Sequence, residues 1–228
     1  MEKITVAQAR KVESVGKTIQ LQGWVRTRRD SKGGFSFLEI NDGSCLGNVQ
    51  VIAEGALPNY QNEILHLTVG SSVSIEGEVL ASPAKGQATE IKASKVVLVG
   101  TADAAKYPLQ KKGHTMEFLR EIAHLRPRSN TFGAVMRVRN QICRSIHEFY
   151  WENGFLYVQS PIITSSDCEG AGQLFRVTTL DYTKPPRNEQ GEIDYTKDFF
   201  GRSTYLTVSG QLEAEIFACS LGKVYTFG

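Results

Sequence analysis

Paired cysteines, clustered histidines and long apolar runs are all missing from this sequence. Its four cysteines lie far apart and form no CxxC pair: Cys45, Cys143, Cys168 and Cys219. The spacing therefore indicates neither a cysteine zinc site nor a disulfide framework, and it fits a reducing cytoplasm. The scattered histidines argue against a metal centre. No run approaches the roughly 20 apolar residues of a membrane span, and the polar N-terminal region has no signal core. We expect a cytoplasmic protein with no resident metal and no membrane partner.

An excess of charge of one sign is also missing. The chain has 26 Lys and Arg residues against 24 Asp and Glu residues, a net charge of +2 over 228 residues. Overall basicity therefore does not indicate a nucleic-acid partner, although a local basic patch still could. Hydrophobic residues make up 41% of the chain, as in ordinary globular proteins, and the length suits one large or two medium domains.

Apolar and polar residues alternate with a period of two in five segments of residues 1–100. The predicted strands are residues 18–26, 35–40, 49–52, 72–80 and 89–99. Turn signals such as Asn41-Asp42-Gly43-Ser44 separate them. A short helical lead-in covers residues 1–16, and a helix-like segment at residues 57–67 separates the third strand from the fourth. This order predicts a small closed Greek-key barrel of the oligonucleotide-binding type.

A long helix is predicted after a linker that is rich in basic residues and proline. Its apolar residues recur at spacings of three and four and form one stripe: Val135, Val138, Ile142, Ile146 and Phe149. Ser129, Asn130 or Thr131 can cap its start, and Asn153-Gly154 can end it.

A buried strand over residues 155–161, closed by Pro161, is predicted next. An acidic, glycine-containing loop follows it, and residues 181–197 are polar and read as a surface insertion. The last predicted elements are a strand at 205–208, a helix at 211–221 and a strand at 223–227.

Basic and aromatic residues gather around the end of the first predicted strand and the start of the second. They are Trp24, Arg26, Arg28, Arg29, Lys32, Phe35 and Phe37. Bases stack on aromatic faces while Arg and Lys contact phosphates, so this cluster could bind single-stranded RNA. The alternative is a solvated strand end beside two core phenylalanines, because one of Phe35 and Phe37 has to face the core in such a barrel.

Two carboxylates flank a cysteine in the acidic loop. Asp167 and Glu169 could hold an ammonium group or another polar ligand, or one of them could cap a turn. Cys168 is better explained as a small packed side chain than as a nucleophile, because no histidine lies near it in sequence.

A second polar group lies where a predicted strand meets a predicted helix, a usual place for ligand-binding side chains. It comprises Ser209, Gln211 and Glu215. N-capping of the helix explains Ser209 equally well, because acidic residues follow it in the first turn.

Six stretches together resemble one family. They are residues 23–44, 81–96, 107–130, 166–181, 197–215 and 223–228. They are similar to the bacterial asparaginyl-tRNA synthetases, class II enzymes of the aspartyl, asparaginyl and lysyl subgroup. The resemblance implies a five-stranded oligonucleotide-binding (OB-fold) barrel at residues 1–102 that binds the anticodon, and a hinge at 103–131. It also implies that residues 132–228 form the first part of a catalytic domain built on an antiparallel sheet.

The resemblance also implies roles for single residues in RNA binding and assembly. Phe37 matches an aromatic that stacks on the central anticodon uridine, Gln50 a polar base contact and Arg28 a nucleotide contact. The predicted long helix and the strand after it look like class II motif 1. The proline of that motif, here Pro161, lies at a homodimer interface.

Asparagine is the amino acid that the resemblance implies, with Glu169 facing its α-amino group and Ser209 and Gln211 near it. One difference from the aspartyl relatives is informative, because they place a lysine where this chain has Ala214. A buried cation suits aspartate, whereas a neutral amide has donors that suit a carboxylate acceptor, which Glu215 or Glu213 could supply.

The implied reaction is the ATP-dependent attachment of asparagine to tRNA(Asn) through asparaginyl-adenylate, with Mg²⁺ on the phosphates. In this family the arginines of motifs 2 and 3 that bind ATP come after the stretch that ends at Gly228. We therefore expect the chain to be an N-terminal half without those catalytic arginines, inactive alone. The alternatives are a non-catalytic module that binds tRNA and dimerises, and an aspartyl-type enzyme, which Ala214 disfavours.

Overall fold

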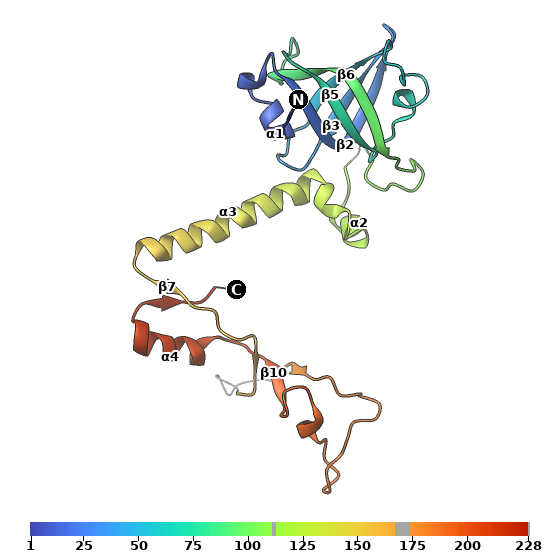
Figure 1. Ribbon diagram of the computed structural model, residues 1–228. Coiled ribbons are helices and arrows are strands. Elements are labelled where there is room, and N and C mark those ends of the chain that lie inside the picture. The colour runs from blue at the N-terminus through green and yellow to red at the C-terminus, as the bar shows by residue number, and fades with distance from the viewer. Residues whose placement is uncertain (111–112, 167–173, 228) are drawn as a thin grey trace. The chain divides into compact units, whose positions relative to one another are not determined.

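Two compact units make up the chain, Met1–Val138 and Arg139–Gly228, and each is described by itself. The computed structural model describes residues 1–110, 113–166 and 174–227 (Figure 1). Among these residues no helix is both long and apolar enough to cross a bilayer. The domain boundaries expected from the sequence, 1–102, 103–131 and 132–228, stay a prediction.

Five strands of the first unit close into a barrel, as the alternation predicts (Figure 1). The strands follow one another in the order β2-β3-β4-β6-β5, and β5 pairs back with β2. The β4–β6 pair is parallel and the other pairs are antiparallel, so the barrel is mixed. The bounds are β2 Thr18–Ser31, β3 Phe35–Asn41, β4 Val49–Glu54, β5 Ser72–Ala81 and β6 Thr89–Gly100, with β1 Glu2–Lys3 beside β2.

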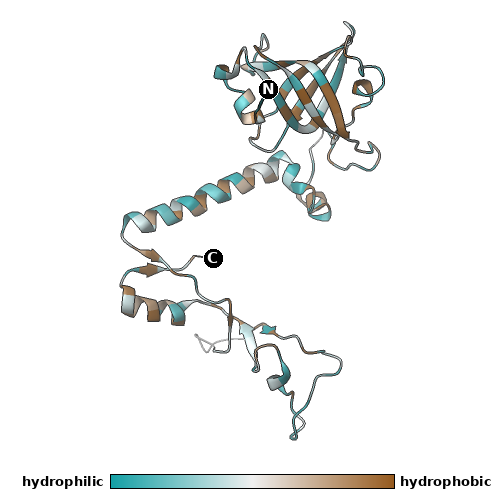
Figure 2. Cartoon of the chain, viewed as in Figure 1, coloured by the Kyte–Doolittle hydropathy of each residue, from teal (hydrophilic) through white to brown (hydrophobic). Residues whose placement is uncertain are grey.

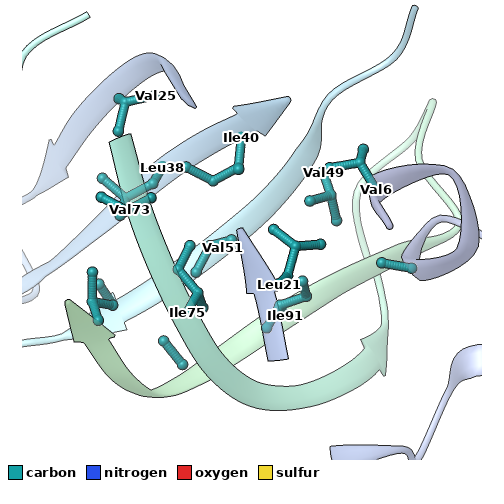
Figure 3. Close-up of a cluster of buried hydrophobic side chains, with 14 of the residues drawn as sticks. Val6, Leu21, Val25, Leu38, Ile40, Val49, Val51, Val73, Ile75 and Ile91 are labelled. Carbon is teal, nitrogen blue, oxygen red and sulfur yellow. The ribbon is translucent and has the colours of Figure 1, made fainter. Parts of the chain in front are cut away.

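The barrel core consists of the side chains that point inward from each strand (Figure 3). Leu21, Leu38, Ile75 and Ile91 are fully buried in it. Figure 2 shows this alternation as brown and pale bands along the strands. Each fully buried aliphatic side chain stabilises the folded state by about 1.5–3 kcal/mol relative to an exposed one.

Short helical segments close the barrel ends. The helical lead-in expected at residues 1–16 is confirmed only in part. It contains α1 Val6–Ala9, which Thr5 and Gln8 cap reciprocally, and the 3-10 helix η1 Val12–Ser14, whereas Glu2–Lys3 form strand β1. The helix expected at 57–67 is wrong in extent, since only η2 Ile64–His66 is helical there. Pro58 lacks an N–H, and the segment forms turns in which Tyr60 N–H donates to Leu57 O and Glu63 N–H to Asn59 O. The Asn59 side-chain amide donates to Val96 O at 2.8 Å and ties these turns to β6.

The hinge leads into the predicted long helix. The hinge contains α2 Met116–Glu121 and η3 Arg126–Arg128, and the helix is α3 Asn130–Glu152. Gly154 follows with a φ of 78°, a left-handed conformation that glycine adopts without steric cost and that ends helices. None of the residues of α3 is buried, so its apolar stripe stays exposed.

The described residues of the second unit form two small sheets, α4, η4 and the part of α3 after Val138. β8, β10 and β9 form an antiparallel sheet, whereas β7 and β11 pair in parallel. α4 Gln211–Leu221 matches the predicted helix. The remaining bounds are β7 Leu156–Tyr157, β8 Ile163–Thr164, β9 Arg176–Val177, η4 Tyr195–Lys197, β10 Thr204–Leu206 and β11 Val224–Tyr225.

The buried strand expected at residues 155–161 is wrong in this chain. β7 covers two residues, and its side chains are exposed: Leu156 by 51% and Tyr157 by 43%. In the described part of the chain its sheet holds only one other strand, β11, so one ladder supports it.

An aromatic cluster holds β11 against α3. Tyr225 stacks on Tyr150 at 4.2 Å between ring centroids, and its hydroxyl lies 2.6 Å from Nδ1 of His147. Removal from water raises the pKa of Tyr225, and the neighbouring Tyr157 and Tyr150 act in the same direction.

The polar insertion has little regular structure, as expected from its composition. One isolated bridge joins Arg187 to Ile193. At its end, the buried Asp198 accepts hydrogen bonds from the Thr179 and Phe199 backbone N–H groups at 2.9 and 2.8 Å. The Thr178 hydroxyl and the Thr179 backbone lower the pKa of Asp198 to about 2. This carboxylate therefore joins the segment before the insertion to the segment after it.

Candidate RNA-binding face and amino-acid site

Both phenylalanines of β3 lie on the outside of the barrel. Ser36, Leu38 and Ile40 are buried, whereas Phe35 and Phe37 are half-buried between them. The expectation that one of the two phenylalanines faces the core is wrong, because residues two apart on a strand point to the same side. Their rings meet edge to face at 5.1 Å, which fixes the Phe37 ring and leaves part of it accessible.

A β-bulge on β2 decides which arginine accompanies Phe37. The register shifts between Val25 and Thr27, so that Arg29 lies opposite Phe37. The Arg29 guanidinium sits 5.5 Å from the centre of the Phe37 ring. Sequence reasoning could not choose Arg29 over its neighbours, since a bulge leaves no clear mark in the alternation.

Arg28 lies opposite Leu38 instead, on the side of the core. Its guanidinium donates to the backbone oxygen of Leu65 and pairs with Asp30 at 3.3 Å. The structure therefore does not place Arg28 with Phe37, and its assignment as a nucleotide contact stays a prediction.

Gln50 extends the outer face onto β4. It lies opposite Glu39, while Ile52 lies opposite Phe37, so Gln50 and Phe37 are diagonal neighbours. The Gln50 amide donates to Oε2 of Glu90 on β6 at 3.1 Å. We call Arg29, Phe35, Phe37, Glu39, Gln50, Ile52 and Lys92 the outer face.

Two charged residues of the outer face were missed from the sequence. Lys92 lies beside Ile52 and pairs with Glu54 at 2.9 Å, and Glu39 accepts from the Asn48 amide at 3.1 Å. Only the parallel pairing of β4 with β6 brings Lys92 here, and no local pattern reveals that pairing. An accessible aromatic ring between two cations can stack a base and contact its phosphates.

Trp24 and Arg26 belong to a different place, the junction of the barrel with the hinge inside the first unit. Arg128 covers the Trp24 ring at 4.4 Å. Arg26 donates to Arg128 O at 2.7 Å and to the Asn130 side chain at 3.3 Å. The basic and aromatic cluster of the sequence is thus divided between a junction and the outer face.

Ser209 precedes α4, but the cap position itself is Gly210. The N-cap expected at Ser209 is therefore one residue early, although its Oγ accepts from the Gln211 backbone N–H at 3.1 Å. A Cβ on Gly210 would lie 2.2 Å from Ser160 Oγ, so this close approach requires glycine. The first turn of α4 is thereby held against the segment that contains Pro161.

Gln211 and Glu215 lie together on an exposed face of α4. The Gln211 amide donates to Oε1 of Glu215 at 2.9 Å, an i, i+4 contact along the helix. The structure thus brings these two predicted site residues together, with Ser209 at the start of the same helix. Glu169 lies outside the described residues.

A groove of about 390 Å³ runs beside this helix start. Pro161, Thr207, Ser209 and Gly210 line it, together with apolar groups of β7, β10 and the residues after β11. None of the described residues that line this groove has a cationic side chain that could meet a triphosphate. In residues 1–110, 113–166 and 174–227, no three or more His, Cys, Asp or Glu side chains form a metal site. The described residues therefore do not by themselves fit ATP with Mg²⁺.

Two family profiles cover most of the chain. The profile described as "OB-fold nucleic acid binding domain" matches residues 19–99, and the one described as "tRNA synthetases class II (D, K and N)" matches residues 115–228. The second match covers half of the chain. The chain belongs to the class II tRNA synthetases of the D, K and N group.

Two curated asparagine–tRNA ligases align with nearly the whole chain. A curated asparagine–tRNA ligase of Syntrophobacter fumaroxidans is 57% identical over 95% of this chain and 46% of its own length. One of Rhodopirellula baltica is 55% identical over 100% of this chain and 46% of its own length. The chain thus spans about half the length of the curated relatives it matches.

A solved class II synthetase has the same fold. Asparaginyl-tRNA synthetase of Pyrococcus horikoshii, complexed with asparaginyl-adenylate, superposes with a TM-score of 0.77 at 25% identity. The match covers 100% of this chain and 48% of that protein. The predicted fold class, an OB-fold barrel followed by part of a class II catalytic domain, is confirmed.

Proposed function

We propose that this chain is part of an asparagine–tRNA ligase, which joins asparagine to tRNA(Asn) with ATP through asparaginyl-adenylate. The observation that carries the proposal is the 57% identity to a curated asparagine–tRNA ligase over 95% of the chain. The aligned region includes both the barrel and the class II segment, and more than half of its positions are identical.

The barrel reads the anticodon through its outer face. A base stacks on Phe37 between the cations Arg29 and Lys92, and Gln50 contacts the edge of a base. Support comes from the accessible Phe37 ring and the 5.5 Å approach of Arg29. Arg28 contributes by fixing the end of β2 through the backbone oxygen of Leu65.

Asparagine binds beside the start of α4. Gln211 and Glu215 offer one hydrogen-bonded pair of acceptors and donors, and Ser209 lies next to them. Ala214 carries no charge, so a substrate carboxylate would find no cation there, whereas the amide of asparagine can donate to Glu215. Glu169 completes the site by facing the α-amino group.

The whole protein supplies what this chain lacks. ATP and Mg²⁺ bind through residues beyond those described, since the groove beside α4 has no cation. Two copies pair through the exposed stripe of α3 and Pro161, because Val138, Ile142 and Phe149 are each more than half exposed and need a cover. The protein works in the cytoplasm, where its tRNA is charged.

Pyrophosphate exchange on the full-length protein tests this function. Asparagine should drive exchange of pyrophosphate into ATP, and aspartate should not. Equal activity with aspartate would instead support the aspartyl-type alternative. The 228-residue chain should show no exchange.

A second function, RNA binding without catalysis, is favoured for the isolated chain by one observation: the barrel has a complete core of its own. The chain alone should bind the anticodon stem-loop, and the affinity should fall steeply as salt rises from about 50 to 200 mM. Pyrophosphate exchange by the chain alone would contradict this assignment.

A further inference from the structure

Ser160 and Gly210 meet where two segments of the second unit run side by side. β10 pairs with β8, and beyond that pair the Thr207 N–H donates to Ile162 O at 2.9 Å. The chain after β10 is thereby led toward Ser160, and α4 begins there with Gly210 as its cap residue. A Cβ on Gly210 would lie 2.2 Å from Ser160 Oγ and 2.8 Å from Ser160 Cβ. The two segments are therefore closer than a side chain at position 210 allows.

The glycine is required by space and not by backbone conformation. Gly210 has a φ of −86° and a ψ of 17°, values that the third residue of a type I turn adopts with any side chain. An alanine would keep this backbone, but its Cβ would have to move about 1 Å away from Ser160 to reach an ordinary van der Waals distance. Thr226 Cγ2 lies 3.8 Å from the same Cβ position, so the residue after β11 also packs there. We expect the exposed first turn of α4 to take up the shift.

We propose that Ser160 and Gly210 are a positioning pair that sets where Ser209 and Gln211 meet asparagine. The inference rests on the proposed function, in which asparagine binds beside the start of α4. Ser209 and Gln211 are the direct neighbours of Gly210, and Ser209 Oγ accepts from the Gln211 backbone N–H at 3.1 Å. A shift of Gly210 moves both residues, and the Gln211 contact with Glu215 moves with them. Ser160 thus acts on the substrate through the helix start, without touching it.

Pyrophosphate exchange by the full-length protein tests the pair. Gly210→Ala should lower kcat/KM for asparagine by about 10- to 100-fold, the cost of a misplacement near 1 Å. The KM for ATP should stay within about twofold, because the described residues that line the groove beside α4 include no cation for a triphosphate. Gly113→Ala is the matched control. A Cβ there meets nothing within 4 Å and its φ lies outside the left-handed region, so both constants should stay unchanged.

Shortening Ser160 separates the contact from the loss of a helix cap. Glycine is a better N-cap than alanine, and that penalty remains whatever residue stands at position 160. In the Gly210→Ala background, Ser160→Ala removes the 2.2 Å contact but leaves the 2.8 Å contact, so it should restore part of the activity. Ser160→Gly removes both and should restore kcat/KM to within about threefold. Ser160→Gly alone should have little effect, because Gly210 has no Cβ to accommodate.

An unchanged kcat/KM for asparagine in folded Gly210→Ala would overturn the proposal, and so would a loss that Ser160→Gly does not reverse. If Gly210→Ala folds only together with Ser160→Gly, and the double variant is active, the pair is supported. If the double variant also fails to fold, Ser160→Thr adds a methyl group at the same contact and should lower kcat/KM severalfold, and an unchanged value would overturn the pair. If the unaltered full-length protein shows no asparagine-dependent exchange, the proposed function itself fails.

Discussion

The barrel and the second unit differ in how completely they bury their apolar side chains. Every barrel strand pairs on both edges, and residues such as Leu38 and Ile75 are fully buried. In the described part of the second unit, α4 has no buried residue, and Ile216 is 70% exposed. Folding stability depends on apolar area removed from water, so the barrel sequence specifies a stable structure and the second unit alone gains little.

The largest expected change in the free energy of unfolding comes from a substitution in the barrel core, whereas a substitution on α4 should have little effect. Leu38→Ala should lower the free energy of unfolding by about 2–5 kcal/mol, because it leaves a cavity among fully buried side chains. Ile216→Ala on exposed α4 should change it by less than about 0.5 kcal/mol. Urea unfolding followed by the intrinsic fluorescence of the barrel measures both. Equal losses in the two variants would contradict the difference between the units.

RNA binding should depend on the barrel and not on aromatic residues of the second unit. Phe37→Ala should weaken stem-loop binding by about 1–3 kcal/mol through the loss of a stacked base. Phe199→Ala is the matched control, since this residue follows the polar insertion in the second unit and is 76% exposed. Fluorescence anisotropy with a labelled stem-loop measures the affinities. A similar loss in both variants would show that the outer face is not the binding surface.

The two adjacent arginines of β2 should separate binding from stability. Arg29→Ala removes the cation over Phe37 and should weaken RNA binding by about 0.5–1 kcal/mol with little change in stability. Arg28→Ala removes the donor to Leu65 O and should lower the free energy of unfolding by about 1.5–3 kcal/mol. Its RNA affinity, measured below the unfolding transition, should change less than that of Arg29→Ala. A larger loss of RNA affinity in Arg28→Ala than in Arg29→Ala would contradict the placement of Arg29, and not Arg28, on the outer face.

The smallest expected effect is the loss of stability of the insertion at acidic pH. The pKa of Asp198 is lowered to about 2 from 3.8, so this carboxylate stabilises the folded insertion above about pH 4. That contribution is lost as the pH falls through about 2. Hydrogen exchange of the Thr179 and Phe199 amides should accelerate over this range relative to barrel amides at the same pH. In Asp198→Asn the acid-dependent part should disappear, and an unchanged pH profile would contradict the assignment.

Local sequence signals predicted the elements whose ends are marked by residues with fixed preferences. α4 was predicted with the bounds that it has, because glycines stand on both sides of it. α3 ends before Gly154 for the same reason, and the five strands follow from their alternation. The ends of these helices and strands are set by the backbone preferences of the residues at those positions.

The rest depends on contacts between segments far apart in sequence. With Arg26 present, the bulge brings Arg29 instead of Arg28 opposite Phe37, and Glu90 meets Gln50 because β4 and β6 pair in parallel. The helix expected near Ile64 yielded to packing of Tyr60 and Ile64 on the barrel. Such contacts depend on the tertiary structure, and neither hydrophobic periodicity nor composition predicts them.

The bulge on β2 has a consequence for how the barrel joins the hinge. Val25 pairs with Ile40 and Thr27 pairs with Glu39, so Arg26 is the bulged residue and has no partner on β3. Deleting Arg26 would make the pairing of β2 with β3 regular, and Arg29 would still lie opposite Phe37. What would disappear is the double anchor on Arg128 O and Asn130. One extra residue in β2 thus lets the barrel bind the hinge without altering the outer face.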